Sequence, residues 1–205
     1  MSSGGSEACP YVGRGGLKLA HALQTFGINP MGMTCADLGC NVGGFTDCLL
    51  QAGASHVFAV DTGYGALAWK MRQDPRVTVM ERTNALHAAP PTRGGTIVQI
   101  NLIAIDLGWT PQRHAIPAAL RWLSPGGRII TLIKPHYELL PDERSLLNRG
   151  ILEHVDAERI AQRTAVELPS LGVRVVGVTR SPIEGGAGKG KSGNAEWLAL
   201  VERDA

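Results

Sequence analysis

A glycine-rich turn between two acidic residues is the part of this sequence with the clearest chemical meaning. The turn lies in the segment Asp37-Leu38-Gly39-Cys40-Asn41-Val42-Gly43-Gly44-Phe45-Thr46, and Asp61 follows one helix and one strand later. A strand ending in an acid and a glycine turn, then a helix, then a second strand ending in an acid is typical of a nucleoside-cofactor site in a doubly wound α/β domain.

The spacing of the glycines indicates which cofactor the turn suits. A dinucleotide turn has glycine at its first, third and sixth positions, but when Gly39 is counted as the first position the third is Asn41, so a pyrophosphate is disfavoured. S-adenosylmethionine has no phosphate, and its sulfonium, carboxylate and ribose suit acids, small residues and the positive end of a helix. The alternative is a tight strand-to-helix connection without a ligand. The candidate cofactor-binding residues here are Asp37, Gly39, Cys40, Asn41, Gly43, Gly44, Phe45 and Asp61.

Charged residues beside apolar runs are the second group that could do chemistry. Asp106 and Lys134 each directly follow a run of apolar residues. A charge at the end of a buried strand is costly unless it is paired or lies at a cleft, and ligands of open α/β sheets bind beyond the carboxyl ends of the strands. Two other charged residues carry a weaker signal. Glu196 precedes the last apolar run and Lys18 lies in an expected helix, and each by itself indicates only a solvated charge.

Alternating strands and helices must position these residues. Near-continuous apolar strands predict a parallel sheet covered on both faces, so the expected fold is α/β and doubly wound. We expect mobile connections at Ala88 to Gly95 and at Glu184 to Gly193. The expected strands are near 34–39, 56–61, 76–80, 100–107, 128–134, 173–179 and 196–201, and the expected helices are at 15–26 and near 44–53, 65–72, 112–123 and 143–166.

Length and composition favour one domain. The 205 residues, 44% of them hydrophobic, predict a tail over 1–10 and one domain over 11–205. A formal charge of +2 neither requires nor excludes an RNA partner. The four cysteines form no Cys-x-x-Cys pair and the histidines are scattered, so we expect structural thiols and no metal. With no signal-peptide core and no membrane-spanning stretch, a cytoplasmic protein is expected.

Six further segments occur in a fixed order along the chain. They are Tyr11-Val12-Gly13-Arg14-Gly15-Gly16-Leu17-Lys18-Leu19, Asn41-Val42-Gly43-Gly44-Phe45-Thr46-Asp47-Cys48-Leu49-Leu50, Gln73-Asp74-Pro75-Arg76-Val77, Glu81-Arg82-Thr83-Asn84, Leu132-Ile133-Lys134-Pro135 and Gly193-Asn194-Ala195-Glu196-Trp197-Leu198. Together these segments resemble the hemolysin A (TlyA) branch of the FtsJ-like ribosomal RNA 2'-O-methyltransferases. The resemblance covers residues 11 to 202, and does not include the RNA-binding S4 domain that usually precedes the catalytic part in that branch.

The resemblance implies the class I methyltransferase fold, a seven-stranded, mostly parallel Rossmann-like sheet. It also implies methyl transfer from S-adenosylmethionine to a ribose hydroxyl of RNA, with ribosomal RNA as the expected partner. The family's catalytic tetrad falls on Lys18, Asp106, Lys134 and Glu196, and Asn84 becomes a contact on the adenine side. Attack by a hydroxyl on the methyl group needs alignment and a nearby proton acceptor. We expect Lys134 to be this base, Asp106 to lie near the methyl, and Lys18 and Glu196 to orient the nucleotide.

RNA phosphates and bases require cations and aromatic rings. The candidate RNA-binding residues are Arg14, Lys70, Arg82, Lys189 and Lys191. Two segments depart from the family pattern, Leu107 to Pro111 and Lys134-Pro135-His136-Tyr137-Glu138, which favours a changed substrate preference. His136 is a rival base.

Other functions remain as alternatives. Residues 185–192, Gly-Gly-Ala-Gly-Lys-Gly-Lys-Ser, satisfy the phosphate-loop pattern of an NTPase, but no strand runs directly into them and few residues follow. A small-molecule O-methyltransferase and a non-catalytic protein that binds cofactor and RNA are the other two alternatives.

Overall fold

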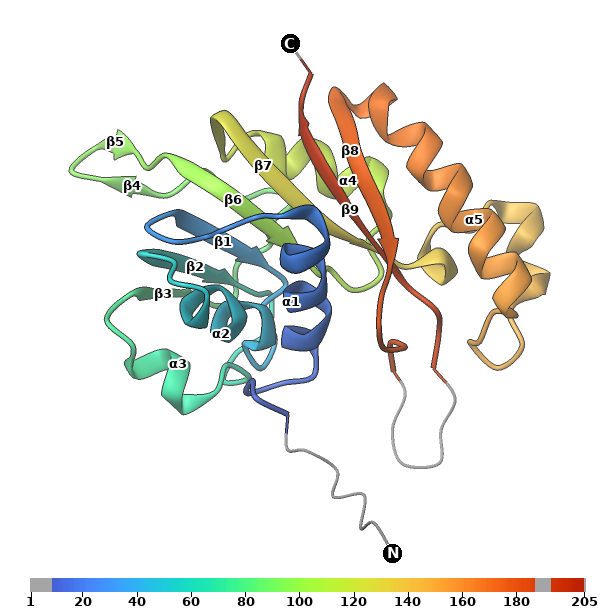
Figure 1. Cartoon of the computed structure of the whole chain (residues 1–205), viewed down its shortest axis with the longest axis horizontal. Helices are drawn as coiled ribbons and strands as arrows, with labels where there is room; N and C mark the ends of the chain where they lie inside the picture. Colours follow the sequence, from blue (N-terminus) through green and yellow to red (C-terminus); the bar gives the residue numbers. More distant parts are fainter. Residues whose placement is uncertain (1–8, 187–192, 205) are drawn as a thin grey trace, which may run out of the picture.

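The chain folds around a seven-stranded sheet with helices on both faces (Figure 1). The computed structural model describes residues 9–186 and 193–204. The strand order is β3-β2-β1-β6-β7-β9-β8; all neighbours from β3 to β7 are parallel, and β9 is antiparallel to both of its neighbours. The expected mostly parallel sheet is therefore confirmed. The strands are β1 (Thr34–Leu38), β2 (His56–Val60), β3 (Val77–Met80), β6 (Ile100–Ile105), β7 (Leu123–Ile133), β8 (Val173–Arg180) and β9 (Trp197–Arg203).

Apolar side chains cover both faces of the sheet because successive residues of each strand point to opposite sides. In β7, Ile130 packs in the cluster that contains Leu19 of α1 and Leu49 of α2, whereas Ile129 packs in the cluster that contains Ile116 of α4. The two faces thus have separate cores. The helices are α1 (Gly15–Phe26), α2 (Gly44–Gln51), α3 (Trp69–Gln73), α4 (Gln112–Leu120) and α5 (His154–Glu167).

Strand register brings the ends of β1, β6, β7 and β9 to one edge of the sheet. Leu38 of β1 pairs with both Val60 of β2 and Ile105 of β6, so the residues after these strands are neighbours. In the antiparallel pair of β7 and β9, Ile133 lies opposite Trp197. Because β9 runs in the reverse direction, its first residues meet the carboxyl ends of the parallel strands.

Three cysteines are buried in β1, in α2 and in the turn between them, and none is in a disulfide. Cys35, Cys40 and Cys48 have free thiols among apolar neighbours, and burial raises the pKa of Cys35 and of Cys48 to about 12. Thiols that stay protonated pack as small apolar groups, which agrees with the expectation of structural cysteines.

The sequence-based element bounds differ from the structure in several places. The strand expected near 128–134 is β7, which already begins at Leu123. The helix expected near 143–166 is instead a 3₁₀ turn at Pro141–Leu146, a tight turn bridged between Asn148 and Ile151, and then α5. Gly150, with φ of +83°, cannot continue a helix. The helix expected near 65–72 begins only at Trp69, and the connection Ala88 to Gly95 contains part of a small hairpin of β4 (Thr92–Arg93) and β5 (Thr96–Ile97).

The remaining short helices are 3₁₀ turns at Pro135–Tyr137 and Leu168–Leu171. In the parts of the chain that the structure describes, no helix has the length and apolar character needed to cross a membrane.

Candidate active site

A cleft of about 890 Å³ opens along the edge where the strand ends meet. Its walls come from the residues after β1, β2, β3, β6 and β7, from α1, and from the segment before β9. The cleft therefore lies where ligands of open α/β sheets bind. Among its lining residues are all four expected catalytic side chains and four of the expected cofactor contacts: Lys18, Asp106, Lys134, Glu196, Gly39, Asn41, Asp61 and Asn84.

Two short ion pairs join the four expected catalytic residues. Lys18 Nζ lies 2.5 Å from Glu196 Oε2, and Lys134 Nζ lies 2.5 Å from Asp106 Oδ1. Lys134 Nζ also donates a hydrogen bond to the carbonyl oxygen of Leu107, at 3.2 Å. The fold thus brings together residues that are up to 178 positions apart in the sequence.

The two pairs differ in their access to solvent. The side chains of Lys18 and Glu196 are only 9% and 3% exposed, against 13% and 23% for Lys134 and Asp106. Burial raises the pKa of Glu196, and the positive charge of Lys18 opposes this effect. Removing one member of a buried pair leaves an uncompensated charge, which costs roughly 3–5 kcal/mol. The Lys18 pair is therefore the fixed one, and Lys134 is the amine that a ligand reaches more easily.

An aromatic corner stands beside Lys134. The Tyr137 ring lies 5.8 Å from Lys134 Nζ and 6.0 Å from the ring of Trp109, whose side chain is exposed to 85% of its full area. The His136 ring packs against Tyr137 with ring centroids 4.1 Å apart and ring planes tilted by 54°. Burial, together with the charges of Lys134 and Lys18, lowers the pKa of His136 to about 4, so its ring is neutral at pH 7.

Asp61 and Asn84 define the other end of the cleft. The Asp61 carboxylate accepts hydrogen bonds from the backbone N–H of Asn41 at 2.8 Å and of Gly63 at 2.7 Å, which fixes it at the cleft wall. Asn84 Oδ1 accepts the N–H of Leu86 at 3.0 Å in a turn that places Asn84 in the lining. A fixed carboxylate, an amide side chain and a wide cleft fit a nucleoside with ribose hydroxyls.

The glycines of the turn are required by protein neighbours. A Cβ on Gly39 would fall 2.5 Å from the carbonyl oxygen of Asp106, and one on Gly43 would fall 2.8 Å from Leu67. Both glycines have positive φ, +93° and +97°. Gly39 lines the cleft, but Gly43 faces the packed side chains of the loop before α3 and lines neither cavity of this region.

Asp37 lies beneath the turn. Its carboxyl group is fully buried, accepts a 2.6 Å hydrogen bond from the Thr46 hydroxyl, and has one oxygen, Oδ1, without a partner among the described residues. Burial raises its pKa to about 7. Asp37 thus supports the turn from below and does not line the cleft in this structure.

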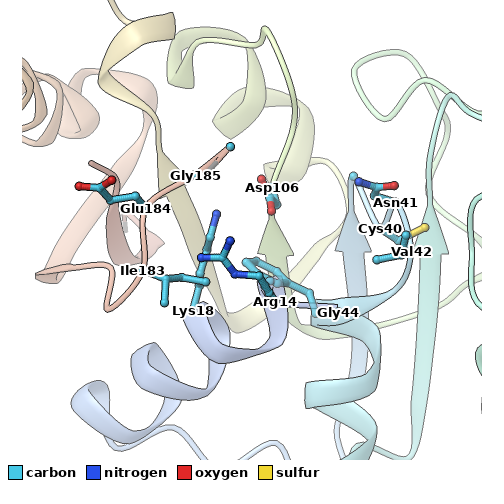
Figure 2. A pocket seen from close by; sticks show the side chains of 14 residues that line it. Arg14, Lys18, Cys40, Asn41, Val42, Gly44, Asp106, Ile183, Glu184 and Gly185 are labelled. Carbon is cyan, nitrogen blue, oxygen red and sulfur yellow. The ribbon is translucent and has the colours of Figure 1, made fainter. Parts of the chain in front are cut away.

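A smaller cavity of about 150 Å³ adjoins the cleft and shares Lys18, Gly39 and Asp106 with it. Figure 2 shows Arg14 and Lys18 between Ile183 to Gly185 on one side and Cys40 to Val42 on the other. Arg14 thus lies at a wall of the site. The expected cofactor-binding residues that line only this cavity are Cys40, Gly44 and Phe45.

The other expected RNA contacts lie away from the cleft lining. Lys70 of α3 is 67% exposed and lies 3.5 Å from Asp47, and the Arg82 guanidinium lies 4.4 Å from the centre of the Tyr64 ring. Lys189 and Lys191, with most of the phosphate-loop pattern, lie outside the described residues.

Two features of the cleft rim were missed from the sequence. Gly185 touches Glu196: a Cβ at Gly185 would fall 2.5 Å from the Glu196 carboxylate carbon and closer still to Oε1. The turn that carries Arg149 was hidden by the expected helix over 143–166, although the Asn148-Arg149-Gly150 sequence is a turn signal.

Comparison with known proteins identifies the family of this chain. The family model described as FtsJ-like methyltransferase matches residues 11–192. The 16S/23S rRNA (cytidine-2'-O)-methyltransferase TlyA of Mycobacterium tuberculosis is 39% identical over 190 residues, which are 92% of this chain and 67% of TlyA. Hemolysin A of Brachyspira hyodysenteriae is 35% identical over 191 residues, 92% of this chain and 75% of that protein. The chain thus spans about two thirds to three quarters of these relatives.

Solved structures show the same fold. A Streptococcus thermophilus protein matches with a TM-score of 0.86 at 35% identity, covering 98% of this chain and 70% of that one. An S-adenosylmethionine-dependent methyltransferase from Mesorhizobium loti matches with a TM-score of 0.59 at 16% identity, covering 89% of this chain and 96% of that one. The fold is therefore that of the Rossmann-like methyltransferases. More narrowly, the chain belongs to the FtsJ-like methyltransferase family, as its sequence resemblance implied.

Proposed function

We propose that this chain transfers a methyl group from S-adenosylmethionine to a ribose 2'-hydroxyl of RNA, with ribosomal RNA as the substrate. The observation that carries the proposal is the convergence of the Lys18–Glu196 and Lys134–Asp106 pairs in the same cleft as Asp61 and Asn84. Two amines and two acids lie in the same cleft as residues that suit a nucleoside. Such an arrangement can align an alcohol with a methyl donor. Residues 11–205 act as one unit in this proposal.

The cofactor contacts follow from the cleft. Asp61 would accept hydrogen bonds from the ribose hydroxyls, Asn84 would contact the adenine, and the backbone around Gly39 would pass close to the amino acid part. When bound, S-adenosylmethionine supplies a methyl carbon on a positively charged sulfur. Asp106, between Gly39 and Lys134, stands near the position of that charge.

Lys134 is the proposed base. It is the more accessible of the two amines, and its contacts to Asp106 and to the Leu107 carbonyl hold it in one place. Lys134 Nζ would take the proton that the 2'-hydroxyl loses when its oxygen receives the methyl group from S-adenosylmethionine, which would leave as the neutral thioether. Lys18 and Glu196, locked together, orient the nucleotide.

The aromatic corner favours RNA over a small substrate. Trp109 is exposed next to the half-buried Tyr137, which lies near Lys134, and stacking on aromatic faces holds unpaired bases at about 1–3 kcal/mol each. Trp109 is held at a φ of +51°, a strained conformation for this residue. A base that stacks there would bring its own ribose close to the amine.

The test is methyl transfer from labelled cofactor. Purified ribosomal subunits, protein-free ribosomal RNA and a small-molecule extract are offered separately, and labelled RNA is digested to nucleosides to locate the methyl group. The proposal expects a 2'-O-methyl nucleoside from RNA and none with Lys134→Met. Label in the extract but in no RNA would support a small-molecule O-methyltransferase, and cofactor binding without any labelled product would support a non-catalytic protein.

A further inference from the structure

A tight turn at the rim of the cleft carries Arg149, an arginine that has no role in the proposed reaction. Asn148 and Ile151 are bridged by two backbone hydrogen bonds of 2.9 Å, and the two residues between them, Arg149 and Gly150, have φ of +51° and +83°. Positive φ at both central residues defines a type I′ turn, which favours asparagine or glycine at its first position. An arginine there is held against its backbone preference.

The turn is part of the cleft wall. Leu147 and Gly150 line the same cleft as Lys134 and Glu196, and Arg149 is exposed between them. The segment before α5 lies at the same end of the sheet as the start of β9 (Figure 1). Arg149 itself is not part of the lining, so the turn carries this exposed arginine next to cleft-lining residues, at the rim of the site that holds the proposed base.

Asn194 fastens the turn to the strand that carries Glu196. Its side chain is buried, at 7% exposed, and both of its polar atoms are used: Oδ1 accepts the N–H of Leu152, and Nδ2 donates to the carbonyl oxygen of Gly150, each at 2.9 Å. The position of Arg149 is thus coupled to the position of Glu196, two residues beyond Asn194.

No acidic side chain among the described residues forms an ion pair with Arg149. Glu143 on the preceding 3₁₀ turn pairs with Arg159 and Arg163, and Glu184 faces His154 at 3.5 Å. An exposed guanidinium without a protein anion, carried by a turn whose backbone is fixed at the rim of a cleft, suits a phosphate, which it can bind through two parallel hydrogen bonds.

We propose that Arg149 is a specific RNA-backbone contact, in which the Asn148–Ile151 turn grips a phosphate next to the nucleotide that enters the cleft, with Asn194 as its positioning residue. This inference rests on the proposed function and deepens it, because it names the part of the substrate that the rim recognises. Phosphate contacts set register and affinity, and base contacts set sequence.

Arg149→Gly is the sharpest test, because glycine accepts positive φ and keeps the turn. We expect the KM for RNA to rise by about tenfold and the slope of log affinity against log salt to fall by about one. The kcat and the calorimetric affinity for S-adenosylmethionine should stay at wild-type values. Arg149→Lys should retain much of the affinity, because the charge remains.

Arg93→Gly is the matched control. Arg93 is also an exposed hairpin arginine, but its hairpin lines a separate cavity with Thr34 and Ser55, at the amino ends of β1 and β2. Wild-type KM and salt slope in Arg149→Gly, or an equal loss in Arg93→Gly, would overturn the inference while RNA methylation by the wild type stands. If the wild type methylates no RNA, the proposed function fails and the inference fails with it.

Discussion

Gly185→Ala should damage catalysis through a single methyl group. The added Cβ would lie 2.5 Å from the carboxylate carbon of Glu196, and carbon atoms in contact normally lie about 3.5–4.0 Å apart. The Glu196 carboxylate or the Gly185 backbone must therefore move by about 1 Å. Glu196 has little freedom, because it is 3% exposed and bound to Lys18 at 2.5 Å.

A displacement of this size at a positioning residue has a large kinetic effect. Misplacing reacting groups by about 1 Å costs on the order of 10²-fold in rate. We expect the kcat of Gly185→Ala for RNA methylation to fall by about that factor. The affinity for S-adenosylmethionine, measured by titration calorimetry, should change little, because Asp61 and Asn84 lie at the other end of the cleft.

Two further variants separate this effect from a general loss of structure. Gly108→Ala is the matched control: Gly108 lines the same cleft, but its added Cβ would meet no atom within 4 Å. Shortening the acid with Glu196→Asp makes room for the methyl group, so the double variant should recover part of the activity that Gly185→Ala loses. Turnover of Gly185→Ala equal to that of Gly108→Ala would refute the reasoning.

Three other predictions concern the proposed base Lys134, the proposed ribose contact Asp61 and the buried acid Asp37. Lys134→Ala should lower turnover by about 10²–10⁴-fold, because the proton acceptor is lost, and leave cofactor affinity almost unchanged, because the proposed contacts of Asp61 and Asn84 remain. Asp61→Ala should weaken S-adenosylmethionine binding by about tenfold or more in calorimetry, since a carboxylate that accepts ribose hydroxyls is lost. Asp37 has a pKa raised by burial to about 7, so the folded state holds a proton that the unfolded state releases near pH 4. Its stabilising contribution is complete below pH 4 and is lost as the pH rises to about 7; urea denaturation should therefore show Asp37→Asn gaining about 3 kcal/mol relative to wild type between pH 5 and pH 8.

For each of these three predictions, one result would contradict it. Arg93→Ala, which removes an exposed cation away from the cleft, is the control for Lys134→Ala, and near-normal turnover in the Lys134 variant would exclude Lys134 as the base. Unchanged cofactor affinity in Asp61→Ala would remove the ribose contact. A stability difference between Asp37→Asn and wild type that stays constant with pH would show that Asp37 is ionised in the folded protein.

The strand-end residues could be predicted from the sequence because their signal is local. Asp106 and Lys134 follow apolar runs, and parallel strands bring their carboxyl ends to one edge. Lys18 and Glu196 carried no such signal, and only the family resemblance singled them out. Their pairing depends on the antiparallel direction of β9, which turns its first residues toward the carboxyl ends of the parallel strands.

The rim of the cleft was the part that sequence patterns predicted least well. Helical spacing over 143–166 concealed the turn at Asn148 to Ile151, whose conformation is stabilised by Asn194 from a distant segment. Gly43 is a second residue whose environment depends on a distant segment. The sequence pattern predicted a ligand contact there, but in the structure the lack of a side chain at Gly43 makes room for Leu67.

The sequence by itself determined the alternation of strands and helices, the glycine turn and the chemical types of the four proposed catalytic side chains, since these follow from periodicity and residue identity. The tertiary structure decided which charges pair, that Asp37 supports the turn from beneath, and where Gly185 and Arg149 lie at the cleft. Those outcomes depend on contacts between residues far apart in the chain, and such distances are set by strand order and register, which no local pattern contains.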